Sequence, residues 1–239
     1  MTGLLKNYQD FTAALKPSRL RYGLSRKADG SMKLRSAARK TNLVRFFAPF
    51  GIKYEQIVSA GLAHGAGIAA VDASVGGSII KDTDGLVTAA RGVVLTVTVA
   101  DCLPLYIWNN AQTVAGVAHA GWRGVRNNIA KEMVAACKRE YDIDASDMKA
   151  FIGPHIGSCH FEVKNDVARQ FAAEQIIKRN DRHYIDLAAV VRGQLANAGV
   201  SDVTVSADCT YCLSETFFSR RRDKPKEIEA MLAYIFLTQ

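Results

Sequence analysis

The sequence predicts a mixed α/β or α+β fold with antiparallel strand pairing, because several segments with strand periodicity precede one with helical periodicity. Residues 92–100, GVVLTVTVA, alternate apolar residues with threonine, which is the period-two pattern of a strand rich in β-branched residues. Residues 103–108 and 113–118 predict the next two strands, joined through a tight turn at Asn109-Asn110. Several adjacent strands mixed with helices favour this class over a purely parallel sheet.

An amphipathic helix is predicted over residues 121–141, where Val125, Ile129, Met133 and Cys137 recur every four residues. Cys137 lies on this apolar stripe, so we expect it to be a core residue. The remaining elements follow in chain order: a strand at 148–152, a turn at 153–157, helices at 165–173 and 186–198, a strand at 203–207, and a helix or strand at 227–236. In the second of these helices, Asp186 is placed as the N-cap and Gly199 as the C-terminal stop.

The composition predicts one globular domain spanning residues 1–239. The chain is 49% hydrophobic and 23% charged, and it shows no internal repeat, low-complexity tract or Gly/Ser linker. No apolar run is long enough for a transmembrane helix, and the first residues do not resemble a signal peptide. We therefore expect a cytoplasmic protein that does not bind membranes.

Charge and cysteine content narrow the expected partners. The net charge of +8 favours phosphate-bearing ligands, while the absence of aromatic residues interleaved with the basic ones disfavours nucleic acid. Five cysteines in a reducing compartment indicate ligand or catalytic roles rather than a disulfide framework. No heptad seam or exposed apolar helix is evident, so we expect a monomer.

Three short motifs combine Gly, His and Cys at the edges of apolar segments: AHGAG with His64, ADCLP with Cys102 and AHAGWRG with His119. Two imidazoles and one thiolate suit zinc, whose catalytic centres keep three protein ligands and an open fourth position. The same residues also fit a nucleophile, with His119 deprotonating Cys102 and Gly-rich turns forming an oxyanion hole. Spacing does not separate these alternatives, and Asp101 either orients a ligand or caps a turn.

Two further motifs predict a phosphate site and a structural pair. GWRG contributes Arg123, and FFSRRRD places Arg221 and Arg222 beside Phe217 and Phe218, which suits a base on a ring with its phosphate on an arginine. His155 or His160 is a candidate proton donor. CTYC, residues 209–212, has no second CxxC to complete a four-cysteine site, so a structural role is expected.

Six ordered motifs together resemble one family, the laccase-domain proteins, also described as multicopper polyphenol oxidoreductases and as purine nucleoside phosphorylases with adenosine deaminase activity. The motifs are AHG at His64, DGLVT (84–88), TVADCLPLYI at Cys102, VAGVAHAGWRG at His119, IGPHIGSCHFEV (152–163), and CTYC followed by FFSRRRD. The resemblance implies mixed sheets in a sandwich with flanking helices, similar to cysteine-dependent deamidating toxins. It also implies a zinc centre of His64, Cys102 and His119, in which copper could substitute.

The resemblance implies a transferase and hydrolase that phosphorolyses adenosine, inosine and methylthioadenosine and deaminates adenosine. Cys102, His119 and Asp101 are then the catalytic candidates. Ser25 and Arg26, in the segment 23–42, match the phosphate-contacting Ser and Arg of the family. Three alternatives remain: a Cys-His amidase that edits peptidoglycan precursors, a polyphenol oxidoreductase with copper at the same site, and a nucleotide-binding module without catalysis. True multicopper oxidation needs more histidine ligands than the five in this chain.

Overall fold

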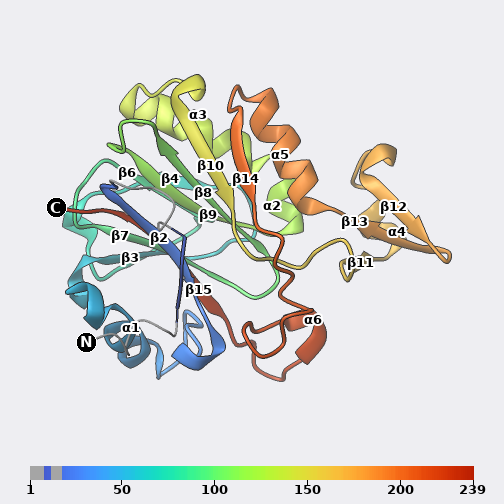
Figure 1. Ribbon diagram of the computed structural model, residues 1–239, viewed down its shortest axis with the longest axis horizontal. Helices are drawn as coiled ribbons and strands as arrows, with labels where there is room; N and C mark the ends of the chain where they lie inside the picture. Colours follow the sequence, from blue (N-terminus) through green and yellow to red (C-terminus); the bar gives the residue numbers. More distant parts are fainter. Residues whose placement is uncertain (1–7, 12–17) are drawn as a thin grey trace.

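Two six-stranded sheets form the centre of the molecule in the computed structural model, which describes residues 8–11 and 18–239 (Figure 1). The first sheet has the order β1 (Tyr8–Asp10), β2 (Leu20–Ser25), β15 (Met231–Leu237), β7 (Val94–Val99), β3 (Ile57–Ala60), β5 (Ile79–Ile80). The second has the order β14 (Asp202–Val205), β10 (Met148–Ile152), β8 (Leu103–Asn109), β9 (Ala115–Ala120), β6 (Gly85–Thr88), β4 (Ile68–Ala70).

Both sheets are mixed, which confirms the predicted fold class. The β8–β9, β8–β10 and β7–β15 pairs are antiparallel, whereas β3–β7, β4–β6 and β10–β14 are parallel. The alternation in 92–100 is explained by the core: Leu95, Val97 and Val99 of β7 pack between the two sheets against residues of β8 and β9. The strands predicted at 103–108, 113–118 and 148–152 are β8, β9 and β10.

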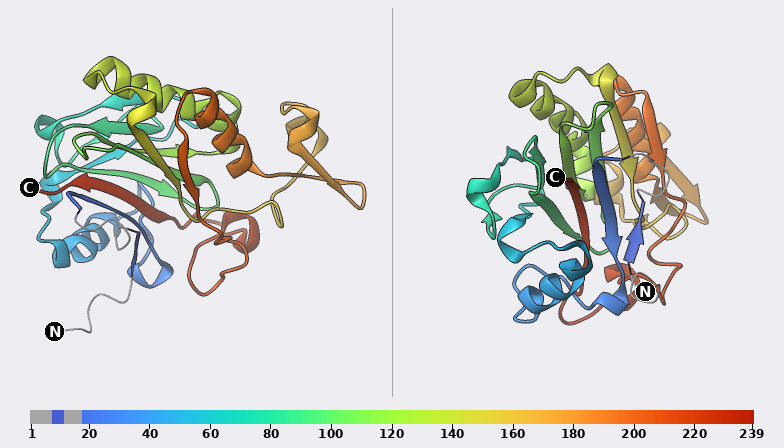
Figure 2. Two further views of the ribbon diagram at one scale, coloured as in Figure 1. Left: turned by 45° about the horizontal axis from the view of Figure 1, so that its top comes forward. Right: turned by 60° about the vertical axis from the view of Figure 1, so that its left-hand side comes forward.

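Helices cover the outer face of each sheet (Figure 2). α1 (Arg39–Phe47) packs on the first sheet through Leu43, Phe46 and Phe47. α3 (Ile129–Tyr141) and α5 (Leu187–Asn197) pack on the second sheet, with Cys137 fully buried as predicted. The result is a sandwich of two sheets between two helical layers.

The predicted helix over 121–141 is wrong in one respect, because the structure has two helices there. α2 (Trp122–Arg126) ends before Asn127, and Asn128 adopts a left-handed conformation with φ 62° ahead of α3. Asparagine tolerates this conformation better than most residues, so the helix breaks without large strain. The break leaves α2 as a separate helix directly after β9.

The region after β10 differs most from the sequence prediction. The helix predicted over 165–173 is only α4 (Asn165–Ala168). β11 (Glu162–Val163) precedes it, β12 (Ile176–Arg179) and β13 (Arg182–Ile185) follow it, and the three strands form a small sheet that projects from the body in Figure 1. α5 begins as predicted, with the Asp186 side chain accepting from the Ala189 amide at 2.9 Å, and Gly199 follows it with φ 97°.

The last apolar segment is the strand β15 rather than a helix. All seven of its residues are buried because β2 and β7 pair with its two edges and both of its faces are covered. A strand buried on both faces loses the alternating pattern, which is why periodicity left helix and strand open. α6 (Arg220–Asp223) lies just before it. Among the described residues, no helix is long and apolar enough to cross a membrane.

Candidate active site and metal centres

His119 has an unusual environment at the end of β9. Its Nδ1 lies 3.0 Å from the Thr98 carbonyl oxygen, and since a carbonyl only accepts, Nδ1 carries the proton and donates. The other ring nitrogen, Nε2, is buried and has no hydrogen-bond partner. Burial, together with the neighbouring His64, lowers the pKa of His119 to about 4. The ring is thus neutral at pH 7, with a lone pair that lacks a partner.

The Cys102 thiol and the His119 ring both face Gly121. A Cβ placed on Gly121 would lie 3.2 Å from Cys102 Sγ and 3.3 Å from His119 Nε2, so only a glycine leaves both atoms undisturbed. Cys102 stands where the chain crosses from β7 in one sheet to β8 in the other. Burial and the Asp101 carboxylate raise the pKa of the Cys102 thiol to about 12, against the opposing charge of Arg220.

His64 completes the group from the loop between β3 and β4. Its ring centroid lies 5.1 Å from that of His119, and its side chain is exposed. The fully buried Asp84 holds the loop: its carboxylate accepts from the amides of His64 and Gly65, both at 2.7 Å. The Asp84 carbonyl also accepts from the His119 amide at 2.7 Å, which couples the two histidines through one residue.

These contacts bring together the three residues that the sequence singled out. An unpaired buried nitrogen, a thiol beside it and a second imidazole are a donor set that fits zinc. The glycine that leaves room for both atoms supports this fit. The ligand atoms do not converge as tightly as those of the second cluster described below.

Asp101 positions its neighbours. Its Oδ1 accepts from Thr210 Oγ1 and its Oδ2 from the Arg221 amide, both at 2.7 Å, while its carbonyl accepts from the Ile156 amide at 2.9 Å. Both carboxylate oxygens are thus engaged, and the residue adopts φ 83°. Asp101 fixes the loop on which Cys102 lies.

The three consecutive arginines of α6 have different surroundings. The charge of Arg220 acts on Cys102, although the sequence motif gave no reason to separate it from its neighbours. Arg221 is half-buried and donates to the Glu162 carbonyl at 2.6 Å. Arg222 donates to the carbonyls of Thr210, Tyr211 and Phe217 and to the Asp223 carboxylate. Because the guanidinium of Arg222 already donates to these protein groups, Arg222 has a structural role and is not part of the phosphate site proposed below.

The other predicted phosphate contacts are divided between two places. Arg123 is exposed on α2, with its guanidinium carbon 4.3 Å from the centre of the Trp122 ring. Ser25, fully buried at the end of β2, accepts from the Leu232 amide at 2.8 Å. Arg26 is half-buried, and its amide donates to Asp29 at 2.7 Å. The two aromatic rings suggested as a stacking surface, Phe217 and Phe218, are buried, so neither offers a face to a base.

A cavity of about 450 Å³ lies near these arginines. Its lining includes Trp122, Phe161, Lys164 and Arg221. The Arg221 guanidinium carbon lies 5.6 Å from the centre of the Phe161 ring. Glu162 and Asp166 also line the cavity, which therefore combines aromatic rings with both basic and acidic groups.

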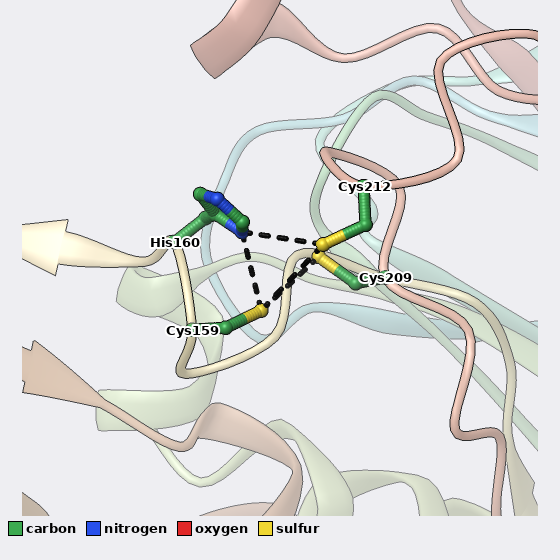
Figure 3. A group of neighbouring side chains, drawn as sticks. All are labelled: Cys159, His160, Cys209 and Cys212. Atoms are coloured by element: carbon green, nitrogen blue, oxygen red, sulfur yellow. Dashed lines mark hydrogen bonds between the residues drawn. The ribbon is translucent and has the colours of Figure 1, made fainter.

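A second cluster of potential metal ligands lies on two loops (Figure 3). Cys159 and His160 follow β10, and Cys209 and Cys212 follow β14; their four ligand atoms all lie within 4.8 Å of one another. His160 thus belongs to this cluster, and its ring stacks on Tyr211 at 3.9 Å. His155, the other candidate proton donor, is buried with Nδ1 2.8 Å from the Gly153 carbonyl. The sequence motifs did not predict this cluster, although the Cys159-His160 pair supplies the two ligands that CTYC lacked.

A comparison with known protein families identifies the family of this chain. A family model described as multi-copper polyphenol oxidoreductase laccase matches residues 30–238. The chain belongs to this family. Its laccase-family relatives include the purine nucleoside phosphorylase YfiH of Escherichia coli, 36% identical over 150 residues, and a purine nucleoside phosphorylase of Deinococcus radiodurans, 35% identical over 190 residues.

The matches differ in coverage. The first spans 60% of this chain and 60% of the E. coli protein, less than two thirds of that relative's length, and the second spans 76% of this chain and 71% of its relative. The crystal structure of YlmD from Geobacillus stearothermophilus superposes with a TM-score of 0.87 at 30% identity and covers 93% of both chains. The fold of this laccase-family chain is therefore shared along nearly its whole length, and its relatives' names describe an enzyme.

Proposed function

We propose that this chain is a zinc-dependent purine nucleoside phosphorylase acting on adenosine, inosine and methylthioadenosine, with adenosine deaminase as a side activity. The observation that carries the proposal is the buried, unpartnered Nε2 of His119 beside the Cys102 thiol. A buried polar atom without a partner is costly, and a metal ion is a partner that both atoms can share. The names of the relatives supply the reaction class.

His64, Cys102 and His119 would hold the zinc, with copper as a substitute at the same position. When bound, zinc supplies Lewis acidity, which lowers the pKa of water and polarises atoms of a substrate. Three protein ligands leave a position for that chemistry. The exposed side of His64 leaves an approach from solvent. The Thr98 carbonyl orients the His119 ring and the Asp84 carboxylate fixes the loop of His64, so both imidazoles are held before substrate arrives.

Phosphorolysis requires a phosphate oxygen to attack the anomeric carbon while the bond to the purine breaks and the base takes up a proton. Arg123 and Arg221 are the candidates to hold the phosphate, with Ser25 and Arg26 as further contacts. The end of β2 lies beside the segment leading to α6, because the Lys27 amide donates to the Thr216 carbonyl at 2.9 Å. The cavity lined by Trp122 and Phe161 supplies aromatic surface for the base.

The alternative amidase would use Cys102 as a nucleophile and His119 as its base. That chemistry is favoured by an ionised thiolate next to an imidazolium. Here burial raises the pKa of Cys102 to about 12 and lowers that of His119 to about 4, which favours the neutral pair. We therefore prefer the metal-ligand role. We also propose that the protein is a cytoplasmic monomer.

The direct test is to incubate zinc-loaded protein with adenosine and phosphate and to separate the products by chromatography. Adenine with ribose 1-phosphate supports phosphorolysis, and inosine supports the deaminase activity. Omitting phosphate should abolish adenine formation and leave inosine formation. The absence of every product from adenosine, inosine and methylthioadenosine would refute the proposal.

A further inference from the structure

We propose that Cys159, His160, Cys209 and Cys212 form a second metal site, a closed tetrahedral zinc centre with a structural role, separate from the centre of His64, Cys102 and His119. The four side chains come from two loops about fifty residues apart in the sequence and point toward one another in Figure 3. No ligand of this centre is shared with the proposed active site.

The distances between ligand atoms match those around a zinc ion. With bonds of about 2.3 Å to sulfur and about 2.0 Å to nitrogen, a tetrahedral ion holds two sulfurs about 3.8 Å apart and a sulfur and a nitrogen about 3.5 Å apart. Cys159 Sγ lies 3.6 Å from Cys209 Sγ and 3.9 Å from Cys212 Sγ. His160 Nδ1 lies 3.2 Å from Cys159 Sγ and 3.4 Å from Cys212 Sγ.

These distances disfavour a disulfide bond as the explanation of why the cysteines lie close together. Two bonded sulfurs lie about 2.05 Å apart, and both measured sulfur pairs are well beyond that. Thiols are weak hydrogen-bond donors, so contacts among three of them would not by themselves hold two exposed cysteines, Cys159 and Cys212, in place. A divalent cation bound by all four side chains would explain why they converge.

The surroundings also suit a closed site. The Gly157 amide points at Cys209 Sγ, with nitrogen and sulfur 3.3 Å apart, an arrangement that favours a thiolate. The His160 ring is held by Tyr211, which stands between the two cysteines of CTYC; the ring planes are 13° apart. Three thiolates and one imidazole satisfy tetrahedral zinc completely, so no position is left for a substrate.

The position of the cluster explains what such a zinc would stabilise. The two loops pair at His155 and Cys209, and the Thr210 amide donates to the His155 carbonyl at 2.9 Å. Thr210 also donates its hydroxyl to Asp101 at 2.7 Å. Zinc in this cluster would therefore hold in place the segment that packs against Asp101, next to Cys102.

The first test is zinc content, measured by mass spectrometry on folded protein purified with reductant and excess zinc. We expect two zinc ions per chain in the wild type, one in Cys212→Ala, one in His119→Ala, and two in Cys137→Ala, the control on the fifth cysteine. Unchanged zinc content in Cys212→Ala would overturn the proposal, as would iron in place of zinc. Loss of zinc in Cys212→Ala but not in His119→Ala would support this site and refute the metal centre of the proposed function.

The second test needs no variant of the cluster to fold. Wild-type and His119→Ala proteins loaded with cobalt(II) should both show the intense absorption of a tetrahedral thiolate-bound cobalt. If that absorption is missing from both, or if peptide mapping of protein alkylated without prior reduction finds a disulfide between any two of the three cysteines, the proposal is wrong.

Discussion

The two clusters of histidine and cysteine differ in how they are mounted and in how many donors they contain. The cluster of His64, Cys102 and His119 lies where strands of both sheets end, and its supports are hydrogen bonds that the Thr98 carbonyl accepts from the His119 ring and the Asp84 carboxylate accepts from the His64 amide. The Cys159 cluster lies on two loops and has four donors. Three donors leave a position for chemistry, whereas four donors complete the coordination of a metal ion that links two segments. The donor count separates the proposed reaction centre from the proposed structural one.

The largest effect is expected from His119→Ala, which removes the nitrogen that has no other partner. We expect kcat/KM for adenosine phosphorolysis to fall by more than about 100-fold, since even residues that only support metal ligands are worth about 10–100-fold. His183→Ala, on β13 and outside both clusters, is the matched control and should retain activity. Comparable kcat/KM in His119→Ala and His183→Ala would contradict the assignment of the reaction centre to the first cluster.

Asp84→Asn should weaken zinc binding at the first cluster by about 10–100-fold. The buried carboxylate accepts from two amides, and an asparagine would turn a donor toward one of them. Competition with a fluorescent zinc chelator measures the affinity. Asp82→Asn, on an exposed residue two positions earlier, should leave it unchanged. An unaltered affinity in Asp84→Asn would mean that this support is dispensable.

Gly121→Ala is a milder test of the same cluster. Gly121 has φ −72°, which alanine adopts without strain, so only the added methyl group matters; it would press on Cys102 Sγ and His119 Nε2. We expect about a tenfold loss of kcat/KM, or about 1.4 kcal/mol of transition-state stabilisation. The control is Gly193→Ala in α5, where a Cβ meets nothing within 4 Å. It should retain activity and gain about 0.5–1 kcal/mol of stability.

The smallest effect on activity is expected from Cys212→Ala. An ion present at about 100 times its Kd contributes about 2.7 kcal/mol, so Tm should fall by about 5–10 °C. The effect on kcat/KM should stay below about threefold, because the first cluster keeps all its ligands. Thermal unfolding with and without added zinc, beside steady-state kinetics, checks both. A large loss of activity at an unchanged Tm would reverse the roles of the two clusters.

The strand β7 could be predicted because Leu95, Val97 and Val99 alternate with threonines, even though all six of its residues are buried. The break between α2 and α3 could not, because the apolar stripe continues through it and only the left-handed Asn128 reveals it. β15 was left as helix or strand because burial on both faces removes its period. The alternation of apolar residues with threonine therefore identified β7, whereas the helix break and β15 depend on tertiary packing that a local pattern does not show.

The two clusters show the same limit. His64, Cys102 and His119 were found together because each follows an apolar segment with a glycine or proline close behind. Cys159 and His160 do not follow this pattern. They lie close to CTYC because β10 and β14 are parallel neighbours. The sequence showed Asp84 only as part of a motif, because its role depends on contacts with the amides of His64, Gly65 and His119 that form in the folded chain.

The most direct measurement is an anomalous difference map, recorded at the zinc absorption edge, from crystals of the zinc-loaded wild-type protein. The account predicts two peaks per chain, one bounded by His64, Cys102 and His119, and one within the cluster of Cys159, His160, Cys209 and Cys212. A map with no peak beside Cys102 and His119 would contradict the proposed reaction centre, and a map with no peak in the second cluster would contradict the structural zinc.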